Sequence, residues 1–190
     1  VLGIAIGVMA LIVVIAVMAG FDKDLRDKVV GNYSHITITG YQAIDDQEYG
    51  RILEKISANP QIKGISPYVQ GQVLIKEGSR FFAVGLKGIN PETEPAVTKL
   101  KKYLTAGNMD ELGQDKVFIG KELALYLGVG LNSGLMAYSP FGKERILKVA
   151  GIFNSGMYDY DLNLIFTNIK TAQDILGLNN KFSAIAIKLD

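Results

Sequence analysis

The first twenty residues constrain this chain more than any other segment. They read VLGIAIGVMALIVVIAVMAG and contain only Val, Leu, Ile, Ala, Met and Gly. As a helix they would rise about 30 Å, the thickness of the hydrocarbon core of a bilayer. The alternatives are a buried core helix and a signal peptide. A buried helix of this length normally carries a polar stripe, which this segment lacks. A signal peptide carries a basic segment before a shorter apolar core. We therefore expect a transmembrane helix over residues 1–21.

Small residues recur at a four-residue spacing in this segment. Gly3 and Gly7 form one such pair, and Ala16 and Gly20 form another near the other end. This spacing lets helix backbones approach closely in lipid, where packing replaces the hydrophobic driving force. We expect these four residues to pack against other helices, with chance as the alternative because Gly and Ala are common in membrane helices.

The same helix is expected to continue into water as a stalk over residues 22–31. Phe21, Leu25 and Val29 would share one face of it, with charged residues on the other. Gly31 is a typical residue at the end of a helix. Such a stalk could transmit displacement from the membrane to the domain that follows.

The rest of the chain has the composition of a water-soluble domain. Every charged residue lies after position 20, and 20 Lys and Arg face 19 Asp and Glu. The net charge of +1 leaves no basic excess for nucleic-acid binding. There is no Cys and a single His, which excludes thiolate catalysis, Cys-ligated metals and His-rich metal sites.

Hydrophobic periodicity predicts an α+β domain with more strand than helix. The first helix after the stalk is expected to begin at Asp45 or Asp46 and to stop at Asn59–Pro60. Further helices are expected over residues 95–107, 121–127 and 170–176. Strands are expected over residues 35–40, 65–75, 81–89, 117–119, 135–139, 146–153, 162–166 and 182–189. Because the last strand reaches Asp190 with no closing element, we expect the natural chain to continue.

Motifs with catalytic potential are weak. The glycines of Gly128–Gly134 are spaced one residue too widely for a dinucleotide fingerprint and follow a helix instead of a strand, which indicates a turn. On a strand, Asp159 and Asp161 would share a face and could hold a cation or serve as acid and base. No third ligand accompanies them, so capping carboxylates at a turn and strand start are favoured over a membrane-anchored enzyme. His35 is expected to be a structural residue. The sequence predicts no catalytic residue and no metal site.

The order of several motifs resembles a known family. These motifs are VMAGFDKDLRDKVVGNYSHITI, SPYVQGQVLI, VGLKGINPETE, KVFIGKELALYLGV and VAGIFNSGMYDYDLNLIFTNIKTAQDIL. In this order they are similar to the permease subunits of lipoprotein-releasing ABC transporters, which belong to the FtsX-like permeases with a MacB-like periplasmic core domain. The resemblance covers nearly all of the chain.

The resemblance implies a porter-like βαβ part with a mostly β, sabre-like part inserted in it. Residues 32–76 and 181–190 would form the porter-like part, and residues 77–180 the sabre-like part. It implies a non-catalytic permease in the bacterial inner membrane, with the soluble part in the periplasm. The chain would hold no cofactor, because ATP and Mg would bind to a separate ATP-binding subunit.

The resemblance also implies the partners. They are the ATP-binding subunit, a second permease copy or paralogue, membrane lipid, a lipoprotein substrate and a periplasmic lipoprotein carrier. The end of the first helix would line the cavity for acyl chains, with Val14, Met18 and Phe21 on one face. Packing of this face against other helices of the permease is an equal alternative.

One departure from the family concerns the carrier. Members that recruit it have a long, Pro-rich hook between two strands of the sabre-like part, and here that position is the short segment Ser139–Arg145. Its candidate partner-contacting residues are Pro140, Phe141, Lys143 and Arg145. The chain would then be a subunit without a hook, or meet the carrier differently, or act on another substrate. A MacB-type exporter and an FtsX-like permease that regulates an envelope enzyme are the alternative functions.

Overall fold

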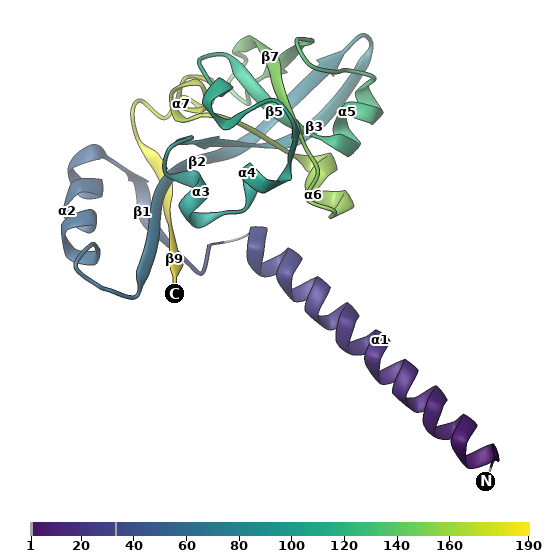
Figure 1. The fold of residues 1–190 in the computed structure, drawn as a ribbon. Coiled ribbons are helices and arrows are strands. Elements are labelled where there is room, and N and C mark those ends of the chain that lie inside the picture. The colour runs from purple at the N-terminus through teal and green to yellow at the C-terminus, as the bar shows by residue number, and fades with distance from the viewer. Residues whose placement is uncertain (1, 33) are drawn as a thin grey trace.

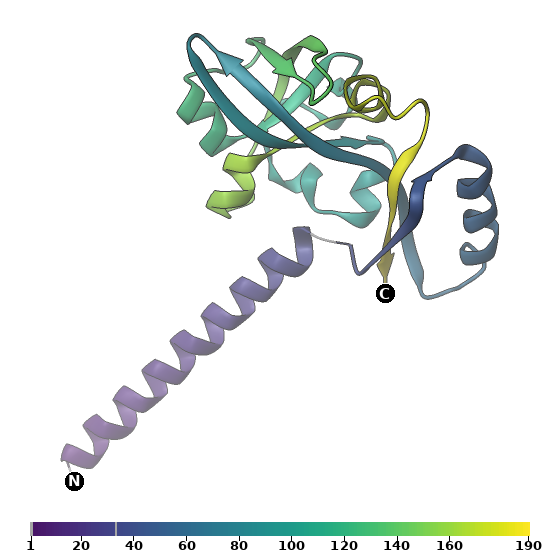
Figure 2. The ribbon, with the colours of Figure 1, turned by 180° about the vertical axis from the view of Figure 1, so that it is seen from behind.

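The computed structural model describes residues 2–32 and 34–190, with no side chains described for residues 23–32. Helix α1 (Leu2–Asn32) runs unbroken through the apolar segment and beyond it. The stretch Leu2–Asp22 is long and apolar enough to cross a membrane, and none of it is buried by the rest of the chain. Figures 1 and 2 show it standing apart from the sheet. The predicted stalk face at Leu25 and Val29 lies outside the described side chains.

Strands and short helices alternate after α1, which confirms the α+β fold class. The strands are β1 (Ile36–Ile44), β2 (Ile62–Glu77), β3 (Arg80–Ile89), β4 (Leu104–Ala106), β5 (Lys116–Gly120), β6 (Gly134–Tyr138), β7 (Glu144–Phe153), β8 (Leu164–Asn168) and β9 (Phe182–Leu189). The helices are α2 (Asp46–Ile56), α3 (Glu94–Val97), α4 (Leu100–Tyr103), α5 (Lys121–Leu127), α6 (Tyr158–Asn163) and α7 (Ile169–Leu176), with a 3-10 turn at Met109–Glu111.

The described strands join in one sheet, part of which closes on itself. The order is β1-β9-β2-β3-β8-β5-β7-β4, and β6 pairs with both β2 and β7. Strands β2, β3, β8, β5, β7 and β6 therefore pair in a ring, which makes a barrel. Strand β2 serves both regions, because its first half pairs with β9 and its second half with β6. The division at residues 76 and 180 stays a prediction.

Alternating apolar side chains fill the barrel. Val73 and Ile75 of β2 point inward and are buried, whereas Leu74 between them is exposed, as the two-residue period of a strand requires. Helices α5 and α7 add apolar side chains to the same cluster. Its other strand residues are Val69, Val84, Leu86, Val117, Ile119, Leu135, Ala137, Leu147, Val149 and Ile165.

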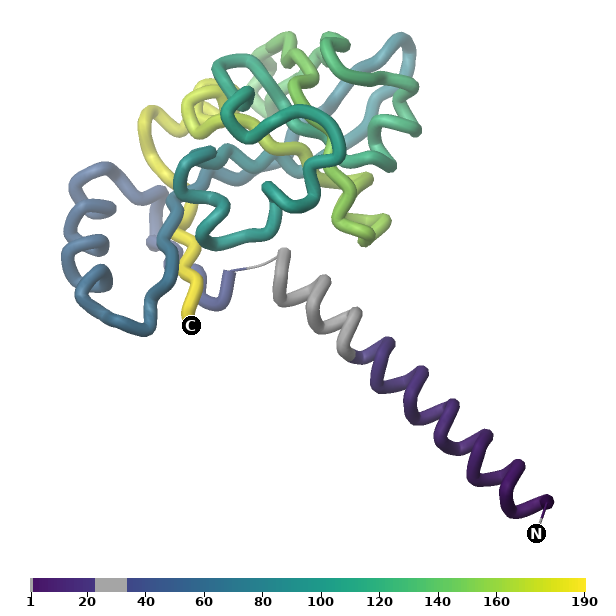
Figure 3. Tube along the Cα trace, in the orientation of Figure 1, coloured from purple at the N-terminus to yellow at the C-terminus, as the bar shows by residue number. Residues whose placement is uncertain are grey.

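Helix α2 covers one face of the region formed by β1, β9 and β2. The Asp45 side chain accepts a hydrogen bond from the N–H of Glu48 at 2.8 Å, which caps the helix as predicted. The helix packs on Ile44, Ile185 and Ile187. Because β9 returns beside β1, the last strand lies next to the first (Figure 3). The opposite face of these strands is not covered by α2.

The helix predicted over residues 95–107 is wrong. The chain forms the short helices α3 and α4 there and then strand β4. Thr98 interrupts the helical path with an extended backbone, and its hydroxyl donates to Glu94 at 3.1 Å. Leu104 pairs with Phe153 of β7. Strand pairing with a distant segment thus overrides the helical spacing of the apolar residues.

The turn and strand start expected at Asp159–Asp161 is also wrong, because this segment forms α6. Asp161 is 1% exposed and accepts hydrogen bonds from the Ser155 N–H at 3.0 Å and the Ser155 hydroxyl at 2.7 Å. Asp159 is exposed, and two positions apart on a helix the carboxylates do not share a face. In the described part of the chain, no three His, Cys, Asp or Glu side chains gather to hold a metal ion. Asp161 therefore fixes the loop before α6.

We expect Gly120→Ala to destabilise the domain, because α6 rests directly on the end of β5. A methyl group at Gly120 would lie 1.9 Å from the main-chain oxygen of Asp161. Overpacking of this kind costs about 1–3 kcal/mol or more, and each kcal/mol lowers the Tm by about 2–4 °C in a chain of this size. Thermal unfolding of the detergent-solubilised chain, followed by circular dichroism, measures the shift.

The matched control is Gly130→Ala. A methyl group there would meet nothing within 4 Å, so the Tm should stay unchanged. Equal Tm values for the two variants would contradict the close packing of α6 on β5.

Candidate functional site

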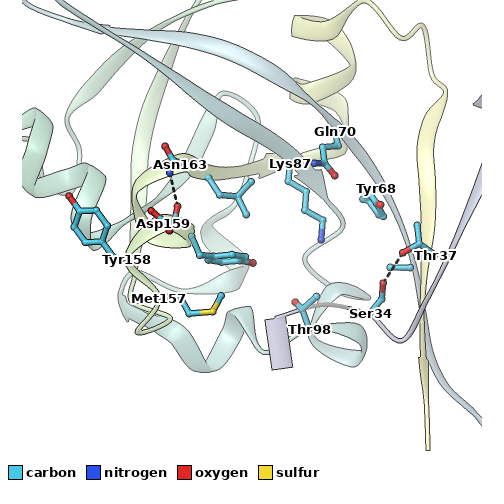
Figure 4. A pocket seen from close by; sticks show the side chains of 13 residues that line it. Ser34, Thr37, Tyr68, Gln70, Lys87, Thr98, Met157, Tyr158, Asp159 and Asn163 are labelled. Atoms are coloured by element: carbon cyan, nitrogen blue, oxygen red, sulfur yellow. Dashed lines mark hydrogen bonds between the residues drawn. The ribbon is translucent and has the colours of Figure 1, made fainter. Parts of the chain in front are cut away.

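A pocket of about 660 Å³ opens on the face of the sheet that α2 leaves uncovered (Figure 4). This volume lies in the usual range for ligand pockets. Thr37 of β1, Gln70 of β2 and Lys87 of β3 line one side, and Met157 with residues of α6 lines the other. Ser34 also lines it, so the pocket begins where the chain leaves α1.

Lys87, which lines the pocket, belongs to a buried ion pair. Glu94 is fully buried, and its Oε1 lies 3.0 Å from Nζ of Lys87, whose side chain is 15% exposed. The hydroxyls of Thr98 and Ser66 also donate to this carboxylate, at 3.1 and 3.4 Å. The ammonium lies 4.8 Å from the ring centroid of Tyr68, which adds a cation–π interaction. These contacts hold Lys87 in one position.

Tyr68 supplies a neutral hydroxyl beside this pair. Burial raises the pKa of Tyr68, a hydrogen bond with Thr37 partly lowers it, and the charge of Glu94 raises it further. The Thr37 hydroxyl also lies 3.1 Å from that of Ser34, next to the end of α1. The phenol therefore stays protonated at neutral pH and can both donate and accept a hydrogen bond.

The residues predicted to meet acyl chains lie together on α1, away from this pocket. Val14, Met18 and Phe21 are all exposed. At 3.6 residues per turn, they fall on the side of the helix that carries Gly3 and Gly7. Their contact with lipid stays a prediction.

The other predicted packing pair, Ala16 and Gly20, falls on a different side of α1. A methyl group at Gly3, Gly7 or Gly20 would meet nothing within 4 Å in the described part of the chain. These small residues therefore have room for a neighbouring helix, and their role in helix packing stays a prediction.

The predicted partner-contacting turn joins β6 to β7 and is compact. The Ser139 hydroxyl accepts hydrogen bonds from the N–H groups of Phe141 at 3.0 Å and Lys143 at 3.3 Å. Gly142 has a positive φ of 77° that closes the turn. The Phe141 ring, 72% exposed, and Pro140 form an apolar tip.

The two basic residues of this turn contact their own chain. Nζ of Lys143 donates to the main-chain oxygen of Asp174 in α7 at 3.2 Å. Nε of Arg145 lies 2.7 Å from Oδ1 of Asp115, and this hydrogen bond raises the pKa of Arg145. Both side chains tie the turn to the barrel, and contact of this turn with a partner stays a prediction.

Two motifs with catalytic potential have structural roles. The imidazole Nδ1 of His35 accepts a hydrogen bond from the N–H of Leu189 at 3.3 Å, which agrees with the structural role predicted for it. Gly128 ends α5 in the left-handed conformation, with a φ of 73°, which confirms the turn.

Sequence reasoning missed the pocket. Its residues lie far apart in the chain, from Ser34 to Ala186, and no spacing rule connects them. One local signal exists, because Lys87 and Glu94 flank a turn and carry opposite charges seven residues apart. That signal indicates an ion pair but no cavity.

We expect Glu94→Ala to destabilise the domain by about 3–5 kcal/mol, because it leaves the Lys87 ammonium buried without its carboxylate. Glu92→Ala, at an exposed position on the same turn, should change stability by less than about 0.5 kcal/mol. The double variant Lys87→Met/Glu94→Leu should recover much of the loss, because it removes both charges. Urea unfolding midpoints measure all three. A double variant as unstable as Glu94→Ala would contradict this account of the pair.

Comparisons with known proteins agree with this fold. A family model described as "MacB-like periplasmic core domain" matches residues 1–190. The lipoprotein-releasing system transmembrane protein LolC of Xylella fastidiosa (strain Temecula1 / ATCC 700964) is 30% identical over 200 residues, which cover 100% of this chain and 48% of LolC. The corresponding protein LolE of Haemophilus influenzae is 31% identical over 133 residues, which cover 68% of this chain and 30% of LolE. The chain thus spans about half the length of the LolC protein.

A solved structure shows the same fold at low sequence identity. The periplasmic region of MacB from Actinobacillus actinomycetemcomitans superposes with a TM-score of 0.59 at 12% identity, covering 86% of this chain and 78% of that one. The match to the family model, in contrast, extends over the whole sequence. This chain belongs to the family of MacB-like periplasmic core domains, and within it resembles the LolC and LolE permeases.

Proposed function

We propose that this chain is the first-helix and periplasmic part of an ABC transporter permease that extracts lipoproteins from the bacterial inner membrane. ATP and Mg would bind to a separate ATP-binding subunit, and this chain would be non-catalytic and convert the cycle into movement. The observation that carries the proposal is that α1 continues unbroken from the apolar segment to Asn32. The similarity to LolC, which extends over the whole of this chain, supports it. A second permease copy or paralogue would complete the membrane part.

The distribution of side-chain size on α1 supports lipid handling. One side of the helix carries Gly3 and Gly7 near its start and the larger Val14, Met18 and Phe21 toward the domain. A neighbouring helix can approach closely at the glycines and must diverge at the larger residues. Divergence leaves a gap near Met18, where a flexible apolar side chain suits acyl chains.

We expect Met18→Asp to abolish lipoprotein release while the helix still inserts. A carboxylate on this face would need hydrogen-bond donors or a cation, and acyl chains offer neither. Ala19→Asp is the matched control, because Ala19 is exposed at the same depth as Met18 and lies at least about 100° around the helix from Val14, Met18 and Phe21. Release is measured in proteoliposomes with the complete transporter and the carrier, and insertion by alkaline extraction. Normal release by Met18→Asp, or equal loss in both variants, would contradict the assignment of this face.

The structural likeness to MacB favours one second candidate, an exporter of another substrate. The same assay separates the two. An exporter would release no lipoprotein even with the unaltered chain.

We propose that a periplasmic lipoprotein carrier contacts the tip of the β6–β7 turn. Exposed aromatic residues often dominate binding energy at interfaces. Phe141→Ala should therefore weaken carrier binding roughly tenfold, or about 1.4 kcal/mol. Tyr41→Ala on β1, also an exposed aromatic residue, should leave it unchanged. Affinities of the detergent-solubilised permease for the carrier measure both, and equal affinity in the Phe141 variant would place the carrier elsewhere.

A further inference from the structure

We propose that the pocket beside Lys87 binds an extended, uncharged stretch of polypeptide, namely the segment of the cargo that follows its lipid-anchored end. This inference rests on the proposed function and adds a recognition site in the soluble domain to it.

The chemistry of the lining fits a polypeptide main chain. Gln70 and Asn163 offer side-chain amides, and Tyr68 adds a neutral phenol. One N–H of Asn163 already donates to the main-chain oxygen of Asp159 at 3.0 Å, which leaves its amide oxygen as an acceptor. Each peptide unit needs both a donor and an acceptor, and these groups supply both. Tyr combined with Ser and Asn, which also line the pocket, is typical of adaptable binding surfaces.

The charges of the pocket disfavour an anion. Lys87 is the sole cation among the described residues that line it, and Glu94 already neutralises it at 3.0 Å. Asp159 adds a negative charge at the α6 side. A phosphate or carboxylate would meet no net positive charge there. A main-chain carbonyl is uncharged and needs only a hydrogen-bond donor. An ammonium has three N–H donors, so Lys87 can donate to such a carbonyl while it stays paired with Glu94.

The position of the pocket fits cargo that is held by its lipid end. Ser34 and Thr37, which line the pocket, follow α1 directly. If acyl chains lie at the face that ends with Phe21, the helix continues to Asn32, about 16 Å further. An extended chain covers this distance with about five residues. The bound segment should therefore begin about five residues after the anchored one.

Site-specific photocrosslinking tests the proposal in the complete transporter in membranes. The crosslinker replaces Gln70, which is exposed and lines the pocket, and in a matched control it replaces Gln42, an exposed Gln of β1 outside the pocket. We expect the Gln70 position to crosslink the linker of a lipoprotein and the Gln42 position not to. Crosslinks from Gln70 to phospholipid alone would overturn the proposal in favour of a headgroup site.

A charge-swap experiment provides a second readout. Acidic residues are placed five to eight positions after the anchored residue of the cargo, and the residues next to the anchor stay unchanged. We expect the unaltered transporter to release this cargo several-fold more slowly, and Gln70→Lys, but not Gln42→Lys, to restore the rate. Equal release of acidic and uncharged linkers would overturn the proposal.

The failure of this inference is distinguishable from failure of the proposed function. Normal lipoprotein release without a linker crosslink at Gln70 would refute the pocket site alone. An unaltered transporter that releases no lipoprotein would refute the proposed function as well.

Discussion

The closure of the barrel depends on a short contact between β6 and β2. Only Leu74, Ile75 and Lys76 of β2 pair with β6, yet this pairing completes the ring of strands around the main apolar cluster. Without it, β2 and β6 would present unpaired edges, and buried side chains such as Ile75 would meet water. The first half of β2 pairs with β9, and both strands contribute residues to the lining of the pocket. The same strand therefore belongs to the barrel and to the pocket.

The sequence was most informative where a signal is local. The apolar run predicted α1, hydrophobic periodicity predicted strands that correspond to β2 and β3, and Asp45 predicted the start of α2. Each of these rests on the period of side chains along one element or on a single cap. Ring closure has no such signal, because the pairing of β6 with β2 joins segments about sixty residues apart.

The errors arose where contacts with distant segments decide the local structure. Leu104 has helical spacing with Val97 and Leu100 but pairs with Phe153 instead. Asp161 fits a strand start but is satisfied by Ser155 in a helical turn. The pocket was missed for the same reason, because five strands and a helix contribute to its lining.

The shared strand β2 also has a mechanical consequence. Its sixteen residues extend roughly 50 Å if straight, and its two halves are hydrogen-bonded to different neighbours. Because one continuous strand joins the neighbours of β9 to those of β6, a displacement beside the pocket can reach the β2–β3 hairpin along a single backbone, without crossing a loop.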